Sequence, residues 1–297
     1  HWPDEVEELP RVTRSALPAQ ADAATIARTV RQRRQQGLPL YELDQDLLEA
    51  LEPDLVIGQD VCASCALPGA AAAAGAAGLK RPAKVLTLEA RRLDDIFANI
   101  RRVATALGAP ARGDRLVRRI QRQFSEIARA VAGAPRPKVF AVEWIEPLKS
   151  AGGWVPELIA AAGGRPLLGA PGDPVREIAW EALRAADPEV VLIMPCGMSI
   201  ERARREVLRL EAQPGWRELA AVRTGRVYLV DGRICSKHGP RVGQAAALLA
   251  RLLHPQAFAD PLPAELAGMA EPWPGTGPLP GVADNGTSMR PREGEDR

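Results

Sequence analysis

The sequence has 297 residues, of which 46% are hydrophobic and 26% charged, a composition typical of a globular protein with room for two domains. Its 39 basic and 37 acidic residues leave a net charge of +2, so the charge balance does not indicate nucleic-acid binding. No run of about 18 apolar residues occurs, which excludes an evident transmembrane helix.

The first part of the chain predicts alternating helices and strands. A helix is expected at 21–36, a strand at 54–59, a second strand at 84–88 and a helix with a clear apolar stripe at 93–107. The alanine-rich run 70–77 is too short to cross a membrane and predicts a helix packed closely on the sheet. The strand at 54–59, like a later one expected at 189–194, has a nearly continuous apolar core, which favours a parallel sheet covered on both faces.

The stretch 114–132 predicts a long amphipathic helix that organises the chain. Asp114 is the expected N-cap, and Gly133 followed by Pro135 marks the end. Such a helix would extend roughly 30 Å. Its apolar residues recur at helical spacing, at Leu116, Val117, Ile120, Phe124, Ile127 and Val131.

A second set of strands and helices follows the long helix. Strands are expected at 138–143, 189–194 and 226–230, and a helix at 240–253. Residues 180–196 repeat the layout of residues 44–60, because each reads as a short helix, a proline, an acid and an aliphatic strand. This likeness suggests duplication, with a site between the two copies.

We therefore predict an α/β fold of two small parallel-sheet, Rossmann-like lobes joined by a single long α-helix. The second lobe opens with a strand and the first does not, so we also expect the first lobe's opening strand, and with it a helix, to be missing. The expected organisation is an N-terminal lobe, a connecting helix, a C-terminal lobe and a disordered tail rich in proline and glycine, at 1–110, 111–134, 135–256 and 257–297.

All four cysteines follow predicted strands, where ligands bind in open parallel sheets. Cys62 and Cys65 form a CxxC pair, and Cys196 and Cys235 come from separate loops. Three interpretations remain open: a redox pair, a metal site made by the four thiols, or thiols that face a bound ligand. Each cysteine taken alone is more often an inert buried thiol.

Enzyme motifs are absent: the sequence lacks GxGxxG after a strand, GxxxxGK[ST], HExxH and GxSxG. We therefore predict a protein that is not an enzyme and needs no catalytic cofactor. The loops instead offer bulky side chains, including Tyr41, Trp144 and Trp154, which suit a flat or apolar ligand.

The order of elements resembles the helical-backbone substrate-binding proteins of ABC importers, and most closely their cobalamin-binding branch. The similarity runs from about residue 9 to 255. Its segments are LPRVTRS (9–15), YELDQDLLEALEPDLVIGQDVCASCA (41–66), VEWIEPLKSAGGWVPELIAAAGG (142–164), AWEALRAADPEVVLIMPCG (179–197), PGWRELAAVRTGRVYLVDG (214–232) and GPRVGQAAALLARLLHP (239–255).

This resemblance implies a corrinoid ligand between the lobes, a rigid helical hinge and a membrane permease as partner. It also implies a periplasmic or lipid-anchored location, although reduced cysteines fit the cytoplasm equally. We expect a monomer that binds no nucleic acid. The implied ligand contacts are Tyr41, Asp60, Cys62, Trp144, Trp154 and Cys196, with Arg233 and His238 behind them.

Alternatives remain beside the corrinoid hypothesis. The same fold carries haem and ferric siderophores in other branches of the family. A different class of function would use Cys62, Cys65, Cys196 and Cys235 to hold a metal or an iron cluster. A metal-inserting enzyme on a similar two-lobed scaffold is a third hypothesis.

Overall fold

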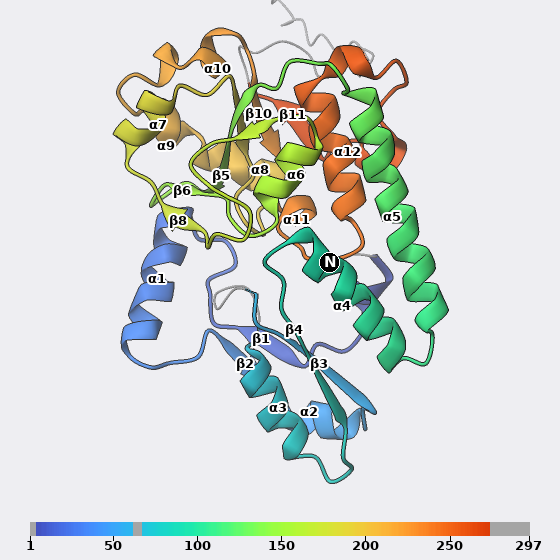
Figure 1. The fold of residues 1–297 in the computed structure, drawn as a ribbon. Coiled ribbons are helices and arrows are strands. Elements are labelled where there is room, and N and C mark those ends of the chain that lie inside the picture. Colours follow the sequence, from blue (N-terminus) through green and yellow to red (C-terminus); the bar gives the residue numbers. More distant parts are fainter. Residues whose placement is uncertain (1–3, 62–66, 274–297) are drawn as a thin grey trace, which may run out of the picture.

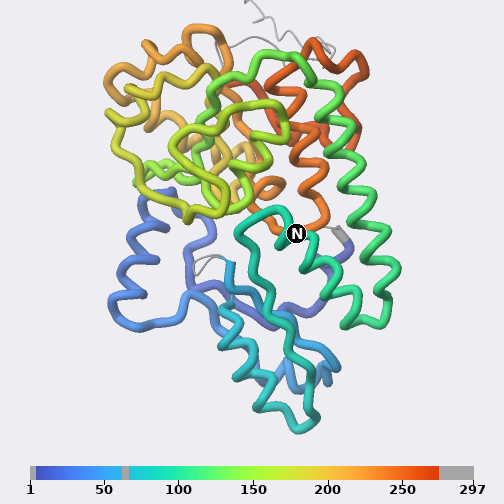
Figure 2. The backbone as a smooth tube through the Cα atoms, in the orientation of Figure 1, coloured from blue at the N-terminus to red at the C-terminus, as the bar shows by residue number. Residues whose placement is uncertain are grey.

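The computed structural model describes residues 4–61 and 67–273, which form two bodies of unequal size (Figure 1). We call residues 9–88 the small body and residues 93–273 the large body. In Figure 2 the chain passes from the small body into the large body through a pair of helices, α4 and α5. Among these described residues, no helix combines the length and apolarity that a membrane crossing requires.

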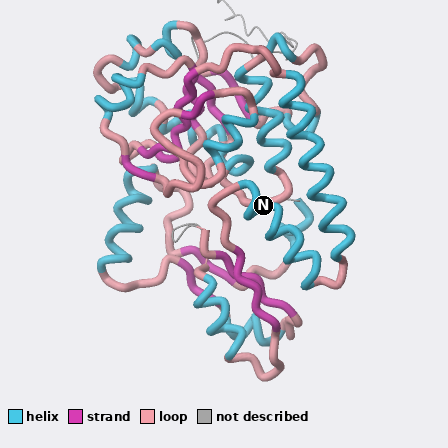
Figure 3. The backbone as a smooth tube through the Cα atoms, viewed as in Figure 1, coloured by secondary structure: helices cyan, strands magenta, loops and turns pink. Residues whose placement is uncertain are grey.

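The small body contains two separate two-stranded sheets (Figure 3). β3 (Leu55–Gln59) and β4 (Lys84–Leu88) pair in parallel, as predicted. A short strand, β1 (Thr13–Ser15), pairs antiparallel with β2 (Tyr41–Leu43), so a strand does precede the first helix, contrary to expectation. The small body is therefore not one parallel sheet.

The alanine-rich run forms α3 (Gly69–Ala77), which packs closely on β3, as expected. A Cβ atom placed on Gly58 would lie 2.9 Å from the Cβ of Ala72 and from the Cα of Gly69. Small residues on both elements therefore permit this close approach. The short helix α2 (Gln45–Ala50) leads into β3.

α1 (Ala23–Gln35) stands apart from the two sheets of the small body (Figure 1). Asp22 caps it, because its carboxylate accepts a hydrogen bond of 2.7 Å from the backbone N–H of Thr25. Arg33 and Arg34 lie in its last turn, where cations complement the helix dipole.

The large body is built on one mixed sheet in the order β11-β10-β9-β5-β6-β8, with β7 also paired to β5. Its centre, β10-β9-β5-β7, is parallel, whereas β6, β8 and β11 run antiparallel to their neighbours. The expectation of an all-parallel sheet therefore holds only for the centre. The strands are β5 (Lys138–Trp144), β6 (Lys149–Ser150), β7 (Arg165–Pro166), β8 (Arg176–Glu177), β9 (Val190–Ile193), β10 (Val227–Val230) and β11 (Ala270–Pro272).

Residues of the central strands alternate between two buried clusters. Leu192 belongs to the cluster packed against α6 and α12, and its neighbours Val191 and Ile193 belong to the cluster on the other face. This alternation follows the two-residue period of a strand covered on both faces. The helices of the large body after α5 are α6 (Val155–Ala161), α7 (Trp180–Ala186), α8 (Ile200–Glu206), α9 (Leu208–Glu211), α10 (Ala220–Arg223), α11 (Gly232–Cys235) and α12 (Val242–Leu253).

α4 (Leu93–Ala106) and α5 (Pro110–Ala130) form a helical hairpin that packs on the large body. The long helix begins at Pro110, four residues earlier than predicted, because proline is well suited to the first helical position. Asp114 is not its cap. Instead its carboxylate accepts a 3.0 Å hydrogen bond from Arg101 of α4.

The buried residues of both hairpin helices join the same cluster as the large sheet, including Phe97 of α4 and Ile120 of α5. The packing thus places α4 with the large body, whereas we predicted from the sequence that residues 1–110 form the N-terminal lobe. Residues 257–273 also differ from the predicted disordered tail. They include β11, and Trp273 is buried with its indole N–H bonded to Glu211 at 2.5 Å.

Candidate functional site

Three loops meet where β5, β9 and β10 end, and we call this surface the strand-end face: residues 144–154, 194–199 and 231–241. Gly232 shows how tightly they meet. Its backbone N–H donates to Met198 O at 3.0 Å, and a Cβ atom here would lie 1.9 Å from Pro195 O. Only glycine fits this contact, so the first turn of α11 is locked against the loop that carries Cys196.

An aromatic pair, Trp154 and His238, lies on the strand-end face. The indole N–H of Trp154 donates to Cys235 O at 2.9 Å, and its ring lies 5.9 Å from the His238 ring at an angle of 56°. Burial, helped by the charge of Lys237, lowers the pKa of His238. His238 therefore favours the neutral imidazole, the form that coordinates metals.

Arg233 is held on the same turn by a buried carboxylate. Its Nε and Nη2 atoms donate to Asp231, with a shortest distance of 2.5 Å. The Asp231 side chain is 5% exposed and the Arg233 side chain 52% exposed, so the pair fixes a guanidinium at the surface. These hydrogen bonds raise the pKa of Arg233 further. Asp231 is not among the predicted ligand contacts, because sequence alone does not show which arginine it binds.

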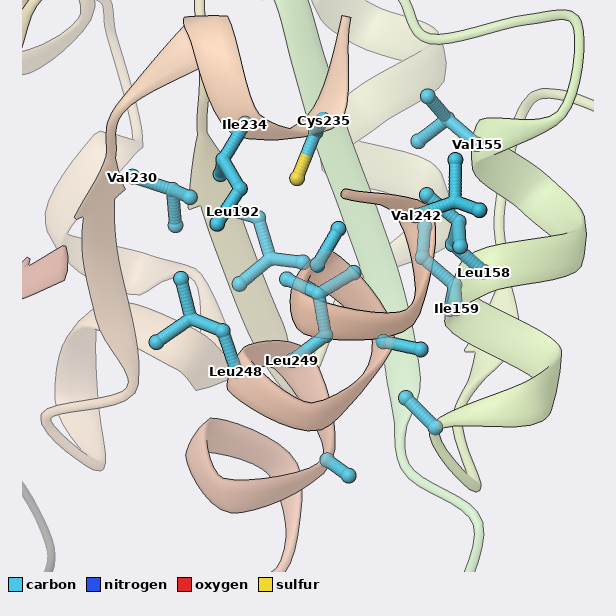
Figure 4. Close-up of a cluster of buried hydrophobic side chains, with 14 of the residues drawn as sticks. Val155, Leu158, Ile159, Leu192, Val230, Ile234, Cys235, Val242, Leu248 and Leu249 are labelled. Carbon is cyan, nitrogen blue, oxygen red and sulfur yellow. The ribbon is translucent and has the colours of Figure 1, made fainter. Parts of the chain in front are cut away.

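Cys235 is placed differently from the cysteine-ligand hypothesis. Its side chain is fully buried, and in Figure 4 the sulfur points into the hydrophobic cluster beside Ile234 and Val242. Burial raises the pKa of the Cys235 thiol to about 12, so it remains protonated and is a poor ligand. The structure therefore favours an inert structural thiol at this position.

The remaining cysteines give no metal centre in the described part of the chain. Cys196 is half-buried, and its backbone N–H donates to Glu143 O at 3.0 Å. Cys62 and Cys65 lie outside the described residues. Within residues 4–61 and 67–273, no group of three or more His, Cys, Asp and Glu side chains is arranged to hold a metal ion.

Trp144 turns toward α1. Its indole N–H donates to Ala23 O at 3.2 Å and to Glu146 O at 3.0 Å. Arg209 strengthens the same junction, because its Nη2 lies 2.9 Å from Asp22 and its Nη1 2.5 Å from Glu146. Trp144 thus joins the N-terminus of α1 to the large body, a role that no pattern in the sequence indicates.

A second junction joins α6 to the start of α4 and to the segment that leads there from the small body. Glu157 accepts a 2.6 Å hydrogen bond from the backbone N–H of Leu93 and forms a 2.6 Å ion pair with Arg92. Both junctions lie beside the strand-end face, since Glu157 belongs to the first turn of the helix that Trp154 precedes. Sequence analysis missed Glu157, whose partners lie 64 and 65 residues earlier in the chain.

Tyr41 and Asp60, the two small-body candidates that the structure describes, lie on separate elements. Tyr41 is in β2, and Asp60 follows β3, where it accepts a 2.8 Å hydrogen bond from the N–H of Gly69 at the start of α3. The structure therefore brings together Trp154, His238, Arg233 and Cys196. A hollow of about 350 Å³ in the small body involves none of the predicted contacts and is lined by Val12, Thr13, Leu43, Leu48, Val56, Ile57, Gly58, Gln59, Leu67, Ala72 and Leu88.

Solved structures with the same fold include several binding proteins. The periplasmic heme-binding protein BhuT, in complex with two hemes, has 31% sequence identity over 73% of this chain and 80% of its own, with a TM-score of 0.57. The periplasmic heme-binding protein RhuT from Roseiflexus sp. RS-1 has 28% identity over 73% of this chain and 81% of its own, with a TM-score of 0.58.

The periplasmic vitamin B12 binding protein BtuF of Vibrio cholerae is more distant, with 18% identity over 71% of this chain and 78% of its own, and a TM-score of 0.53. At this identity the likeness concerns the fold alone, so the corrinoid ligand has no specific support. No curated protein matches the sequence.

A family model described as periplasmic binding protein matches residues 32–234, about two thirds of the chain. This range includes the Glu157 junction and most of the strand-end face, and it begins after Asp22 and Ala23 of the α1 junction. The match agrees with the expectation of a binding protein without catalytic turnover. The chain belongs to the periplasmic binding protein family.

Proposed function

We propose that this protein is the substrate-binding protein of an ABC importer and that its ligand is an iron tetrapyrrole of the haem class. The support is the family membership together with identities of 31% and 28% to two heme-binding proteins, against 18% to a B12-binding protein. Haem, an alternative in the sequence analysis, thus takes the place of the corrinoid as the main hypothesis.

The observation that carries this choice is Arg233 on its buried partner Asp231. The ion pair uses Nε and Nη2 of the guanidinium, while about half of the Arg233 side chain remains exposed. A planar guanidinium is suited to carboxylates. Haem carries two ionised propionates, whereas the fringe of cobalamin is made of neutral amides, so this group favours the haem class.

The aromatic pair Trp154 and His238 adds to the support that the charge of Arg233 gives to this ligand class. His238 offers ring surface for a flat macrocycle, and Trp154, which is only 6% exposed, supports the His238 ring from the core side. The lowered pKa of His238 leaves its imidazole neutral near pH 7, so that a ring nitrogen can serve as an axial ligand to iron. In this arrangement the tetrapyrrole lies against the strand-end face, and Tyr41 and Asp60 approach from the small body.

The same proposal covers the partner and the place of action. We expect a periplasmic or extracytoplasmic monomer that delivers its ligand to a membrane permease. The α4–α5 hairpin would act as a stiff connection, because bending α5 breaks backbone hydrogen bonds, and lobe motion would then be small.

Titration of haem into the protein, followed by its visible absorbance, tests the proposal, with cobalamin and cobinamide titrated in parallel. We expect saturable one-to-one binding of haem. Arg233→Gln should weaken haem at least about tenfold, the effect of losing one charge-assisted contact, while the matched variant Arg223→Gln, at an exposed arginine of α10, should not. Tight binding of a corrinoid without binding of haem would overturn the haem assignment and restore the corrinoid hypothesis.

A further inference from the structure

The outward face of α5 carries an unusual concentration of positive charge, which we call the arginine stripe. All of its members are exposed, and most recur at spacings of three or four residues, on the side of the helix opposite the buried Val117, Ile120 and Ile127. α5 lies along the outer edge of the molecule in Figures 1 and 2. The stripe consists of Arg112, Arg115, Arg118, Arg119, Arg122 and Arg129.

These charges are not balanced locally. Of the two acids in α5, Asp114 already forms an ion pair with Arg101 of α4 at 3.0 Å, which leaves Glu126. Within residues 4–61 and 67–273, no ion pair joins an arginine of the stripe to a carboxylate. Elsewhere the protein does pair its arginines, as Arg204 with Glu271 at 2.7 Å.

We propose that the arginine stripe is a docking surface for an anionic phospholipid bilayer. The stripe extends over roughly 25 Å, at 1.5 Å per residue, as a row of long flexible cations. Its exposed neighbours include Gln121, Ser125, Glu126 and Ala128, so it offers no aromatic or large aliphatic side chain to anchor in a protein pocket. Dispersed lipid phosphates need no such anchor.

The charge of the stripe determines the size of the expected effect. Attraction to an anionic membrane increases partitioning about fivefold for each basic residue near the surface and weakens within a Debye length. The protein as a whole has a net charge of only +2, so its overall charge cannot produce such binding. Binding should therefore depend on the stripe and not on the number of arginines in the chain.

The test measures co-sedimentation of the full chain with phosphatidylcholine vesicles that contain or lack phosphatidylglycerol. One triple variant removes three charges from the stripe, Arg115→Gln/Arg119→Gln/Arg122→Gln. The control removes three exposed, unpaired charges from the large body, Arg205→Gln/Arg217→Gln/Arg223→Gln. Glutamine has nearly the helix propensity of arginine, so α5 should remain folded, which circular dichroism would check.

We expect binding only to the vesicles with phosphatidylglycerol, lost at about 0.5 M salt. The stripe variant should bind about 100-fold more weakly, and the control variant within a few-fold of the unaltered protein. Lysine at the same three positions should preserve binding, since it preserves the charge. Equal losses in both glutamine variants, loss with lysine, or no binding by the unaltered protein would each overturn the proposal.

Duplex DNA serves as a competing polyanion in the same assay. Tighter binding to DNA than to anionic vesicles would also overturn the proposal, because the stripe would then recognise nucleic acid. Haem titration of the stripe variant separates this inference from the proposed function. Since the arginine stripe and the strand-end face share no residue, haem binding should be unchanged even if vesicle binding is lost.

Discussion

The two bodies differ in how completely they bury their sheets. Every residue of β9 in the large body is fully buried, with Leu192 and Ile193 at 0% exposure. In the small body, Ile57 of β3 is 46% exposed and Val85 of β4 is 41% exposed. These two strands are nevertheless rich in aliphatic residues, as β9 is. A sheet of two strands has too few neighbours to cover both of its faces.

This difference in burial predicts that the two bodies differ in rigidity. The large body contributes the strand-end face and the buried cluster beneath it, so it can hold Arg233 and His238 in fixed positions. The small body has fewer buried residues. It is tied to the large body through α1, and the segment that follows β4 is held at Arg92 by its ion pair with Glu157. We therefore expect the small body to open locally at a lower free energy than the large body.

The largest expected effect comes from truncating matched aliphatic residues in the two sheets. Leu192→Ala should reduce the free energy of unfolding by about 2–5 kcal/mol, because it leaves a cavity between β9 and the helices. Ile57→Ala should cost less than about 1 kcal/mol, because Ile57 is already half in solvent. Urea unfolding would measure both. Similar losses for the two variants would contradict the contrast between the bodies.

A second prediction asks whether the rigidity of the large body extends to its loops. Gly232→Ala should destabilise the protein by about 1–3 kcal/mol, because the added Cβ atom would clash with Pro195 O. Gly239→Ala is the matched control in the same segment, since nothing lies within 4 Å of a Cβ atom there. Thermal unfolding would measure the difference, and equal melting temperatures would show that the two loops are not locked together.

A third prediction concerns the junction between the bodies. Arg209→Gln removes the ion pairs to Asp22 and Glu146, whose side chains are 42–50% exposed, and a longer pair of 3.5 Å to Glu206, whose side chain is 9% exposed. The expected loss of global stability is about 1–2 kcal/mol, most of it from the buried Glu206. The clearer result should be faster hydrogen exchange in the first turn of α1. Arg204→Gln breaks an ion pair within the large body and should leave α1 unchanged. Faster exchange of α1 in both variants would contradict the interpretation that Arg209 holds the N-terminus of α1 on the large body.

Much of the fold could be predicted because its signals are local. The strand at 84–88 and the helix from Leu93 were predicted nearly to the residue, since apolar periodicity and breaking residues lie within each segment. The antiparallel strands β6, β8 and β11 were missed because they are two or three residues long and depend on distant partners. The start of α5 was misplaced because Asp114 resembled a cap, whereas its partner is on α4.

The candidate site was predicted less completely, because burial and pairing are decided by tertiary packing. The strand-end rule located the loops that carry Trp154, Cys196, Arg233 and His238. It could not show that Cys235 points into the core, because the sequence around a loop cysteine is the same whether its thiol is buried or faces a ligand. Nor could it show that Trp144 binds Ala23, which lies 121 residues earlier.

The smallest expected effect is a pH dependence that belongs to the large body alone, because His238 and His254 are the only histidines among the described residues. Burial lowers the pKa of both. The unfolded chain protonates its histidines near pH 6.5, whereas the folded protein does so only at lower pH. Protons therefore favour the unfolded state as the pH falls, so the contribution of the two histidines to stability is constant above about pH 7 and declines below about pH 6.5. His254→Gln should flatten part of this decline, and urea unfolding at a series of pH values would measure it. A variant whose stability falls in parallel with that of the unaltered protein would assign the dependence to other groups.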